Sequence, residues 1–220
     1  MLTFIVSNFD YIAPFYDRLV QLVFGEELLR IQKRFLSDIP KTSHILIVGG
    51  GTGQILIEVL KKVPNAKVCY LEASEKMINY SLERLKTERP SAMNQVLFRH
   101  SINLPMLPTA SFDVIITPFV LDLFEKQTLE GVFKKLDQAL SNKGIWIWTD
   151  FVIPQGKFKW PAWMLIQSMY LFFRIVAGIS AKKLPDIHSL FRTHQYRLLH
   201  REIALKGIVE SRVYRRNPAL

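Results

Sequence analysis

Cysteine is nearly absent from this sequence, with Cys69 alone among 220 residues. A single cysteine excludes an intrachain disulfide framework and any zinc site built mainly from thiolates. Because Cys69 lies in a run that predicts a strand, we interpret it as a core residue. Residues 1–6 are apolar but lack the basic segment and the cleavage site of a signal peptide. We therefore expect a cytoplasmic protein.

Acidic residues are outnumbered, since 19 Asp and Glu stand against 29 Lys and Arg and the net charge is +10. The excess is spread along the chain, and its densest group is Arg212, Arg215 and Arg216. Basic residues do not interleave with aromatic ones in any recognisable nucleic-acid module, so we expect no nucleic-acid partner. A solvated basic surface is the plain interpretation, and contact with an anionic membrane stays open.

Clustered metal ligands are absent as well. His188, His194 and His200 are spaced by six residues, which does not place them on one helical face, and no group of acids accompanies them. We expect no metal site, although one of these histidines could act as a base toward a bound substrate.

The sequence does contain one glycine-rich stretch, residues 45–53, with the sequence ILIVGGGTG. Its four apolar residues predict a strand that is buried on both faces. The glycines predict a tight turn, and the apolar spacing over residues 54–63 predicts a helix. A strand, a glycine turn and a helix in this order bring backbone N–H groups and a helix N-terminus against a polar or anionic ligand.

A second strand is predicted over residues 67–72 and ends in Glu72, 23 positions after Gly49. In nucleoside-binding α/β folds an acid near this offset accepts hydrogen bonds from ribose hydroxyls. Ser74 then predicts the N-cap of a helix over residues 75–87. A solvated strand end is the alternative for Glu72, but the glycine turn and the acid together favour a nucleoside-containing ligand.

Strands and helices alternate through the first 150 residues, which implies right-handed crossovers and a parallel sheet. Further strands are predicted over residues 95–99, 112–117 and 145–151, and helices over 9–38 and 124–140, the second ended by residues 142–144. After a helix over 186–196, strands over 198–206 and 208–215 flank Gly207 and must pair antiparallel.

These elements predict a single α/β domain over residues 1–220. Its fold is a doubly wound, Rossmann-like, seven-stranded and mostly parallel sheet with an antiparallel last strand. We expect N-terminal helices to form a cap over residues 1–40, and a helical insertion to follow the fifth strand over residues 154–184.

Four features carry a resemblance to a known family: ILIVGGGTG over residues 45–53, EASEKM over 72–77, Leu104–Pro105 followed by SFDVI over 111–115, and the final antiparallel strand pair. Together they resemble the class I S-adenosylmethionine-dependent methyltransferases. The opening FDYIAPFYD over residues 9–17 is similar to the N-terminus of the ubiquinone and menaquinone biosynthesis methyltransferases. The resemblance covers residues 9–150 in detail and implies S-adenosylmethionine as cofactor and S-adenosylhomocysteine as product.

By position, the resemblance also implies a set of cofactor contacts. The backbone at Gly49, Gly51 and Gly53 would face the methionine part of the cofactor, and Glu72 would hold both ribose hydroxyls. The other implied positions are Tyr16 over the cofactor, Ala73 and Met77 beside the adenine, His100, Ser101 and Ile102 at the adenine edge, and Thr117 near the methyl group. The sequence departs from the family at Ile47, where an acid is usual, and at His100–Ser101, where an aspartate is usual.

Methyl transfer from a sulfonium mainly requires that the acceptor is aligned with the methyl carbon and that water is excluded. The sequence therefore need not show a catalytic residue. We assign none, and Asp122, Asp150 and Tyr170 are unranked candidates. A nicotinamide-dependent oxidoreductase would need glycine at position 54, which is Gln54. A non-catalytic protein that binds the cofactor or a partner stays open.

The segment over residues 157–183 is apolar on most of its circumference, with lysines at both ends. Charged and polar residues interrupt it, so it is a poor transmembrane span. Three interpretations compete: a lid over a hydrophobic or aromatic small-molecule acceptor, a homodimer interface or plain core, and a peripheral membrane contact. We favour the lid, and expect Trp163 and Phe172 to contact the acceptor.

Overall fold

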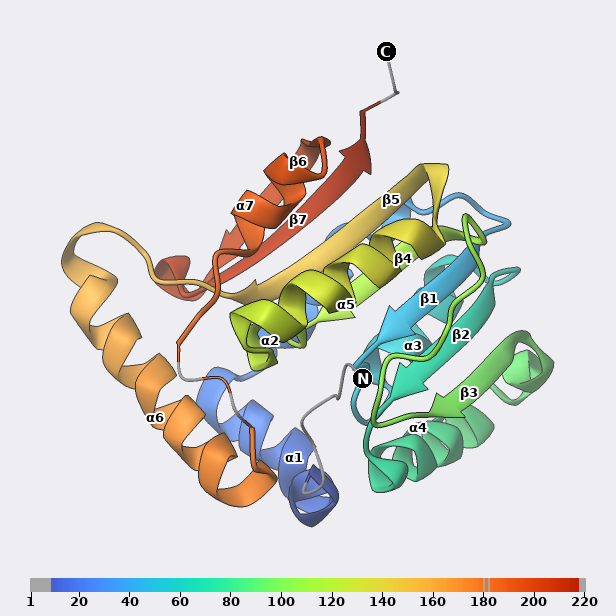
Figure 1. Cartoon of the computed structure of the whole chain (residues 1–220). Coiled ribbons are helices and arrows are strands. Elements are labelled where there is room, and N and C mark those ends of the chain that lie inside the picture. The colour runs from blue at the N-terminus through green and yellow to red at the C-terminus, as the bar shows by residue number, and fades with distance from the viewer. Residues whose placement is uncertain (1–8, 180, 182, 218–220) are drawn as a thin grey trace.

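The computed structural model describes residues 9–179, 181 and 183–217, which form a seven-stranded sheet with helices on both faces (Figure 1). The apolar residues 1–6 lie outside the described residues. The strands are β1 (His44–Val48), β2 (Lys67–Glu72), β3 (Val96–His100), β4 (Phe112–Pro118), β5 (Leu140–Phe151), β6 (Tyr196–Ala204) and β7 (Val209–Arg216). Their order is β3-β2-β1-β4-β5-β7-β6, and only β7 runs against the others. The predicted fold class is confirmed.

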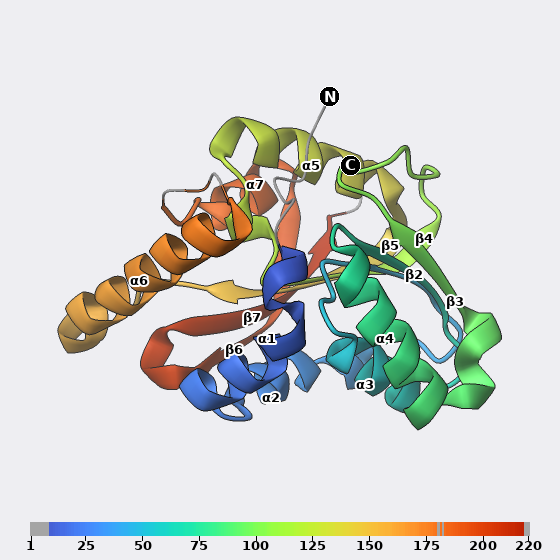
Figure 2. The same ribbon diagram turned by 90° about the horizontal axis from the view of Figure 1, so that it is seen from below.

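The apolar run of β1 lies at the centre of the sheet, where residues 45–48 are completely buried. Helices α3 (Gln54–Lys62) and α4 (Glu75–Glu88) cover one face, while α5 (Lys126–Ala139) and α7 (Ile187–Thr193) cover the other (Figure 2). Each face has its own apolar cluster, one around Tyr70 and one around Trp146. A strand covered on both sides must be apolar throughout, which is why this run contains no polar residue.

The N-terminal region predicted to be helical over residues 9–38 is divided into separate helices. It contains α1 (Phe9–Phe24), α2 (Glu27–Lys33) and a short 3-10 turn (Leu36–Asp38), and Gly25, with a φ of +60°, separates the first two.

The predicted stop of the helix before β5, at residues 142–144, is wrong. Helix α5 ends at Ala139, because Leu140 already pairs with Phe112 in the sheet.

Helix α6 (Lys159–Ala177) follows β5 and packs beside α1, away from the main sheet. The rings of Phe9 and Phe173 are 5.7 Å apart, and a third apolar cluster joins both helices to the end of β5. Among the described residues, no helix has the length and apolar composition needed to cross a membrane. The pair of helices α1 and α6 thus stands at the edge of the sheet where the parallel strands end (Figures 1 and 2).

Candidate cofactor and acceptor site

The glycine turn after β1 brings backbone to the carboxyl edge of the sheet. Gly51 has a φ of +63°, a conformation that side chains other than glycine rarely adopt. A Cβ built at Gly51 would meet only Tyr16, whose Cε1 atom is 3.9 Å away, whereas one at Gly49 would strike Val120 at 2.6 Å. Gly51 is therefore the position at which the bare backbone faces open space.

Glu72 ties the end of β2 to this turn. Its Oε2 accepts the N–H of Gly51 at 3.0 Å, and its Oε1 accepts the N–H groups of Ala73 at 2.8 Å and Ser74 at 3.1 Å. Burial raises the pKa of this carboxyl above its ordinary value, and the three backbone donors oppose that rise. The carboxylate, 9% exposed, thus holds the turn in place.

A hollow of about 70 Å³ lies over the turn and the end of β2. Six residues expected in the cofactor site line it together: Tyr16, Gly49, Gly51, Glu72, Ala73 and Met77. The other lining residues were not among those expected at the cofactor: Phe9, Pro118, Phe119, Val120 and Leu123. The hollow has the placement expected for a nucleoside ligand in an α/β sheet, at the carboxyl ends of neighbouring parallel strands.

The other expected contacts do not line this hollow. Thr117 is fully buried, and its Oγ1 accepts the indole N–H of Trp146 at 2.9 Å, so the following Pro118 and Phe119 take its expected place. Gly53 starts α3, and a Cβ there would lie 2.9 Å from the Cα of Ser81. Gly53 is therefore required by packing against α4.

The residues expected at the adenine edge are also outside the hollow. The Nε2 of His100 is 2.9 Å from the carbonyl of Ala73, and the hydroxyl of Ser101 donates to the carbonyl of Asn103 at 2.5 Å. Ile102 is 44% exposed. Ile47, at the position where the family usually has an acid, is fully buried in the sheet and cannot reach a ligand.

Two carboxylates fasten α1 over the hollow. Asp10 accepts the hydroxyl of Ser74, at the N-cap of α4, at 2.5 Å. Asp17 accepts the hydroxyl of Thr52 and the guanidinium of Arg84, each at 2.6 Å. Tyr16, between them in the chain, is held against the glycine turn, where burial and then the charge of Asp17 raise the pKa of its phenol.

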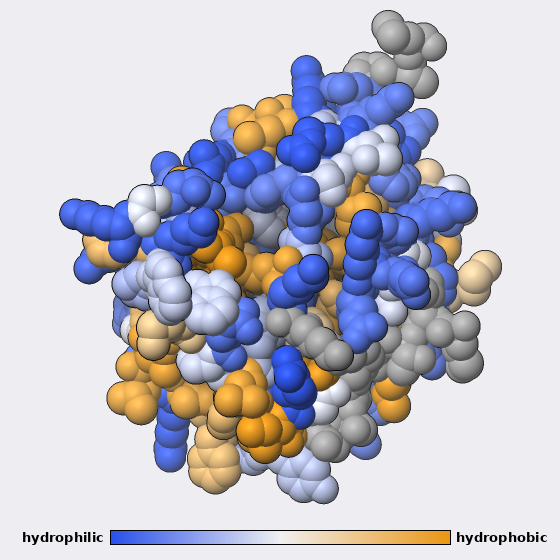
Figure 3. Space-filling model, turned by 60° about the vertical axis from the view of Figure 1, so that its left-hand side comes forward, coloured by the Kyte–Doolittle hydropathy of each residue, from blue (hydrophilic) through white to orange (hydrophobic). Residues whose placement is uncertain are grey.

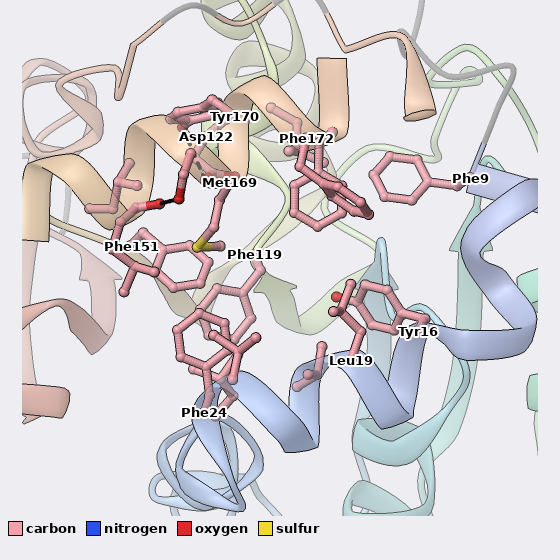
Figure 4. A pocket seen from close by; sticks show the side chains of 18 residues that line it. Phe9, Tyr16, Leu19, Phe24, Phe119, Asp122, Phe151, Met169, Tyr170 and Phe172 are labelled. Carbon is pink, nitrogen blue, oxygen red and sulfur yellow. Dashed lines mark hydrogen bonds between the residues drawn. The ribbon is translucent and has the colours of Figure 1, made fainter. Parts of the chain in front are cut away.

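An apolar cavity of about 230 Å³ adjoins the hollow between α1 and α6 (Figure 4). Tyr16, Phe9, Phe119 and Leu123 line both spaces, so only their side chains separate the two. The remaining walls come from α1, the end of β5 and α6, among them Leu19, Phe24, Phe151, Met169 and Phe172. Of the two residues expected to contact the acceptor, Phe172 lines this cavity, whereas Trp163 does not line it and is 43% exposed.

Asp122 and Tyr170 lie at one end of this cavity, across from Tyr16, and Asp150 is next to Asp122 (Figure 4 labels Asp122 and Tyr170). The hydroxyl of Tyr170 donates to Asp122 Oδ2 at 3.2 Å, and Asp150 Oδ2 accepts the backbone N–H of Asp122, also at 3.2 Å. Burial raises the pKa of Asp122 to about 6, while burial and then the charge of Asp122 raise the pKa of Asp150 well above its ordinary value. A carboxyl whose pKa is raised accepts a proton more readily than an ordinary carboxylate does.

The three histidines singled out in the sequence lie beside three different carboxylates. His188 is 3.2 Å from Glu210, His194 is 3.4 Å from Asp137, and His200 is 3.7 Å from Asp38. No group of three or more potential ligands able to hold a metal occurs within residues 9–179, 181 and 183–217.

Comparisons with known proteins agree with the fold. A family model described as a methyltransferase domain matches residues 46–146. The carboxy-S-adenosyl-L-methionine synthase of Nautilia profundicola is 29% identical over 66% of the chain, and the demethylmenaquinone methyltransferase of Porphyromonas gingivalis is 28% identical over 60%. Each match spans 56% of the relative's own length. The crystal structure of a SAM-dependent methyltransferase from Aquifex aeolicus superposes with a TM-score of 0.59 at 15% identity, covering 90% of this chain and 96% of that one.

Proposed function

Because the chain belongs to the class I S-adenosylmethionine-dependent methyltransferases, we propose that it transfers a methyl group from this cofactor to a small lipophilic acceptor. The observation that carries the proposal is the apolar cavity beside the hollow over the glycine turn. A lipophilic molecule in the cavity would be separated from a cofactor in the hollow only by side chains of α1 and the β4–α5 loop.

The residues at the hollow fit the cofactor. Glu72 offers a carboxylate to ribose hydroxyls at the end of β2, and the bare backbone at Gly51 leaves room for close approach. Ala73 and Met77 supply an apolar wall beside that carboxylate. When bound, the cofactor would supply an electrophilic methyl group on a sulfonium. The protein's part is to align the acceptor and to exclude water, which apolar walls do well.

The cavity also indicates what the acceptor looks like. Polar side chains among its walls are confined to Tyr16, Asp122, Ser168 and Tyr170 within the described residues. A mostly apolar or aromatic molecule with a single polar group would leave few buried polar atoms unpaired. If that group is a hydroxyl, its proton would leave on methylation, and the Asp122 carboxylate is the base nearest to the cavity.

A pair of tryptophan substitutions on α6 tests the proposal. Met169→Trp should fill the cavity, while the control Met164→Trp adds the same bulk on the exposed face. Calorimetry should show unchanged affinity for S-adenosylhomocysteine in both. Release of S-adenosylhomocysteine should be measured with a panel of lipophilic acceptors and with polar molecules of equal size. We expect turnover of a lipophilic acceptor by the wild type and Met164→Trp, and its loss in Met169→Trp. Cofactor binding without turnover of any acceptor would instead favour a non-catalytic binding protein.

A further inference from the structure

Exposed apolar side chains are concentrated on α1 and α6. Of 16 large apolar side chains that are exposed in the described residues, ten lie on these two helices, which pack against each other. They include Leu22 on α1 and Trp160 and Ile175 on α6, which are 85%, 69% and 73% exposed. Single exposed apolar residues are common on protein surfaces, but a contiguous group marks an interaction surface.

The exposed residues of α6 form one stripe along the helix. Trp160, Trp163, Met164, Leu171, Phe172 and Ile175 follow the three- and four-residue spacing of a single helical face. The opposite face, with Ala162, Ile166 and Tyr170, is buried against the rest of the protein. Figure 3 shows apolar side chains gathered on the side of the molecule to which α6 belongs. The helix thus lies along the surface and presents a second apolar face outward.

The charged residues on and beside α6 are basic. Helix α6 contains no Asp or Glu, and both acids of α1, Asp10 and Asp17, are engaged by α4 and the glycine turn. In contrast, Arg18 on α1 and Lys157, Lys159 and Arg174 on or beside α6 are exposed. An apolar stripe with aromatic residues and a basic margin complements the interface of an anionic bilayer, where rings enter the headgroup region and cations meet lipid phosphates.

We propose that the outer faces of α1 and α6 dock onto the surface of a membrane that contains anionic lipid. Val23 and Phe172 belong both to this docking surface and to the walls of the apolar cavity. The cavity is therefore continuous with the docking surface. If the acceptor is lipophilic, a point that rests on the proposed function, it can pass from the bilayer into the cavity without crossing water.

Vesicle flotation of the full chain tests the docking. At low salt, the wild type should float with phosphatidylcholine vesicles that contain phosphatidylglycerol, and much less with pure phosphatidylcholine. The double variant Trp160→Ser/Ile175→Ser should lose flotation. The matched control Met106→Ser/Ile203→Ser, which changes exposed apolar residues outside both helices, should float like the wild type. Removing the charge of Arg174 with Arg174→Gln should weaken association about fivefold.

Two results would overturn the proposal. One is the absence of flotation with anionic vesicles, or equal flotation of the wild type and Trp160→Ser/Ile175→Ser. The other is a homodimer, seen by sedimentation equilibrium, that this double variant dissociates, because the face would then join two copies of the chain. Calorimetry with S-adenosylhomocysteine should give wild-type affinity in every variant, which separates a failure of docking from a failure of the proposed function.

Discussion

Replacing Gly51 by alanine separates the cost of backbone strain from the loss of ligand space. The left-handed conformation at this position costs an L-residue roughly 1–2 kcal/mol. The new methyl group has room in the fold, since its nearest neighbour is Tyr16 Cε1 at 3.9 Å. We therefore expect a folded variant whose midpoint of thermal unfolding falls by about 2–8 °C. The cofactor, in contrast, would have to approach a methyl group in place of bare backbone. Crowding of about 1–3 kcal/mol at a close contact raises its Kd by roughly 5- to 150-fold.

The chain offers a matched control for this experiment. Gly156 also has a positive φ, +79°, and a Cβ built there meets nothing within 4 Å. Gly156→Ala should lower the unfolding midpoint by a similar amount, because the strain is alike, and should leave cofactor affinity unchanged. Thermal unfolding and isothermal calorimetry with S-adenosylmethionine measure the two quantities. Wild-type affinity in Gly51→Ala would remove the glycine turn from the cofactor site.

Three further changes test other parts of the site. Glu72→Gln removes the buried negative charge and should weaken cofactor binding by about 1–3 kcal/mol in calorimetry; unchanged affinity would argue against a ribose contact. Arg84→Ala breaks the bond to Asp17 and should loosen α1, raising the cofactor Kd about fivefold, whereas Lys86→Ala, which breaks an exposed pair on the same helix, should have no effect. The raised pKa of Asp122 means that the folded state holds a proton more tightly than the unfolded one, so the contribution of Asp122 to stability is fully present at low pH and is lost as pH rises through about 6. Measured by urea unfolding, the free energy of unfolding of the wild type should fall by about 1–2 kcal/mol between about pH 5 and about pH 8. Asp122→Asn should flatten this dependence on pH. An unchanged slope in the variant would exclude Asp122 as its cause.

The sheet, the glycine turn and Glu72 could be predicted because short-range patterns determine them, whereas Tyr16, Ala73 and Met77 were implied only by the family resemblance. Four consecutive apolar residues specify a strand covered on both faces, and the glycines and Glu72 follow at the strand ends, which parallel strands bring together. The place of Thr117 could not be predicted. Strand β4 runs one residue further than expected, and Phe119 adopts a positive φ of +51°, so the chain turns toward the ligand two residues late.

The apolar cavity depends on contacts between segments far apart in the sequence. Its walls come mainly from α1, the β4–α5 loop, the end of β5 and α6. No local sequence pattern predicts that these segments lie next to one another. The same holds for Asp122 and Asp150, which are 28 positions apart and were candidates without rank. On α6, apolar periodicity identified an unusual helix but could not distinguish Phe172, which lines the cavity, from Trp163, which faces outward.

The fastening of α1 has a consequence for the rate at which the cofactor enters. The hollow beneath the helix is about 70 Å³, well below the roughly 300–1,000 Å³ of small-molecule sites. We therefore expect α1 or Tyr16 to move outward when a nucleoside enters. That movement would break the bonds of Asp10 or Asp17, whereas the glycine turn is already braced from behind by the hydroxyls of Tyr70 and Ser81 on the Gly51 carbonyl. The observed association rate in stopped flow should then level off at high cofactor concentration, at the opening rate of the helix.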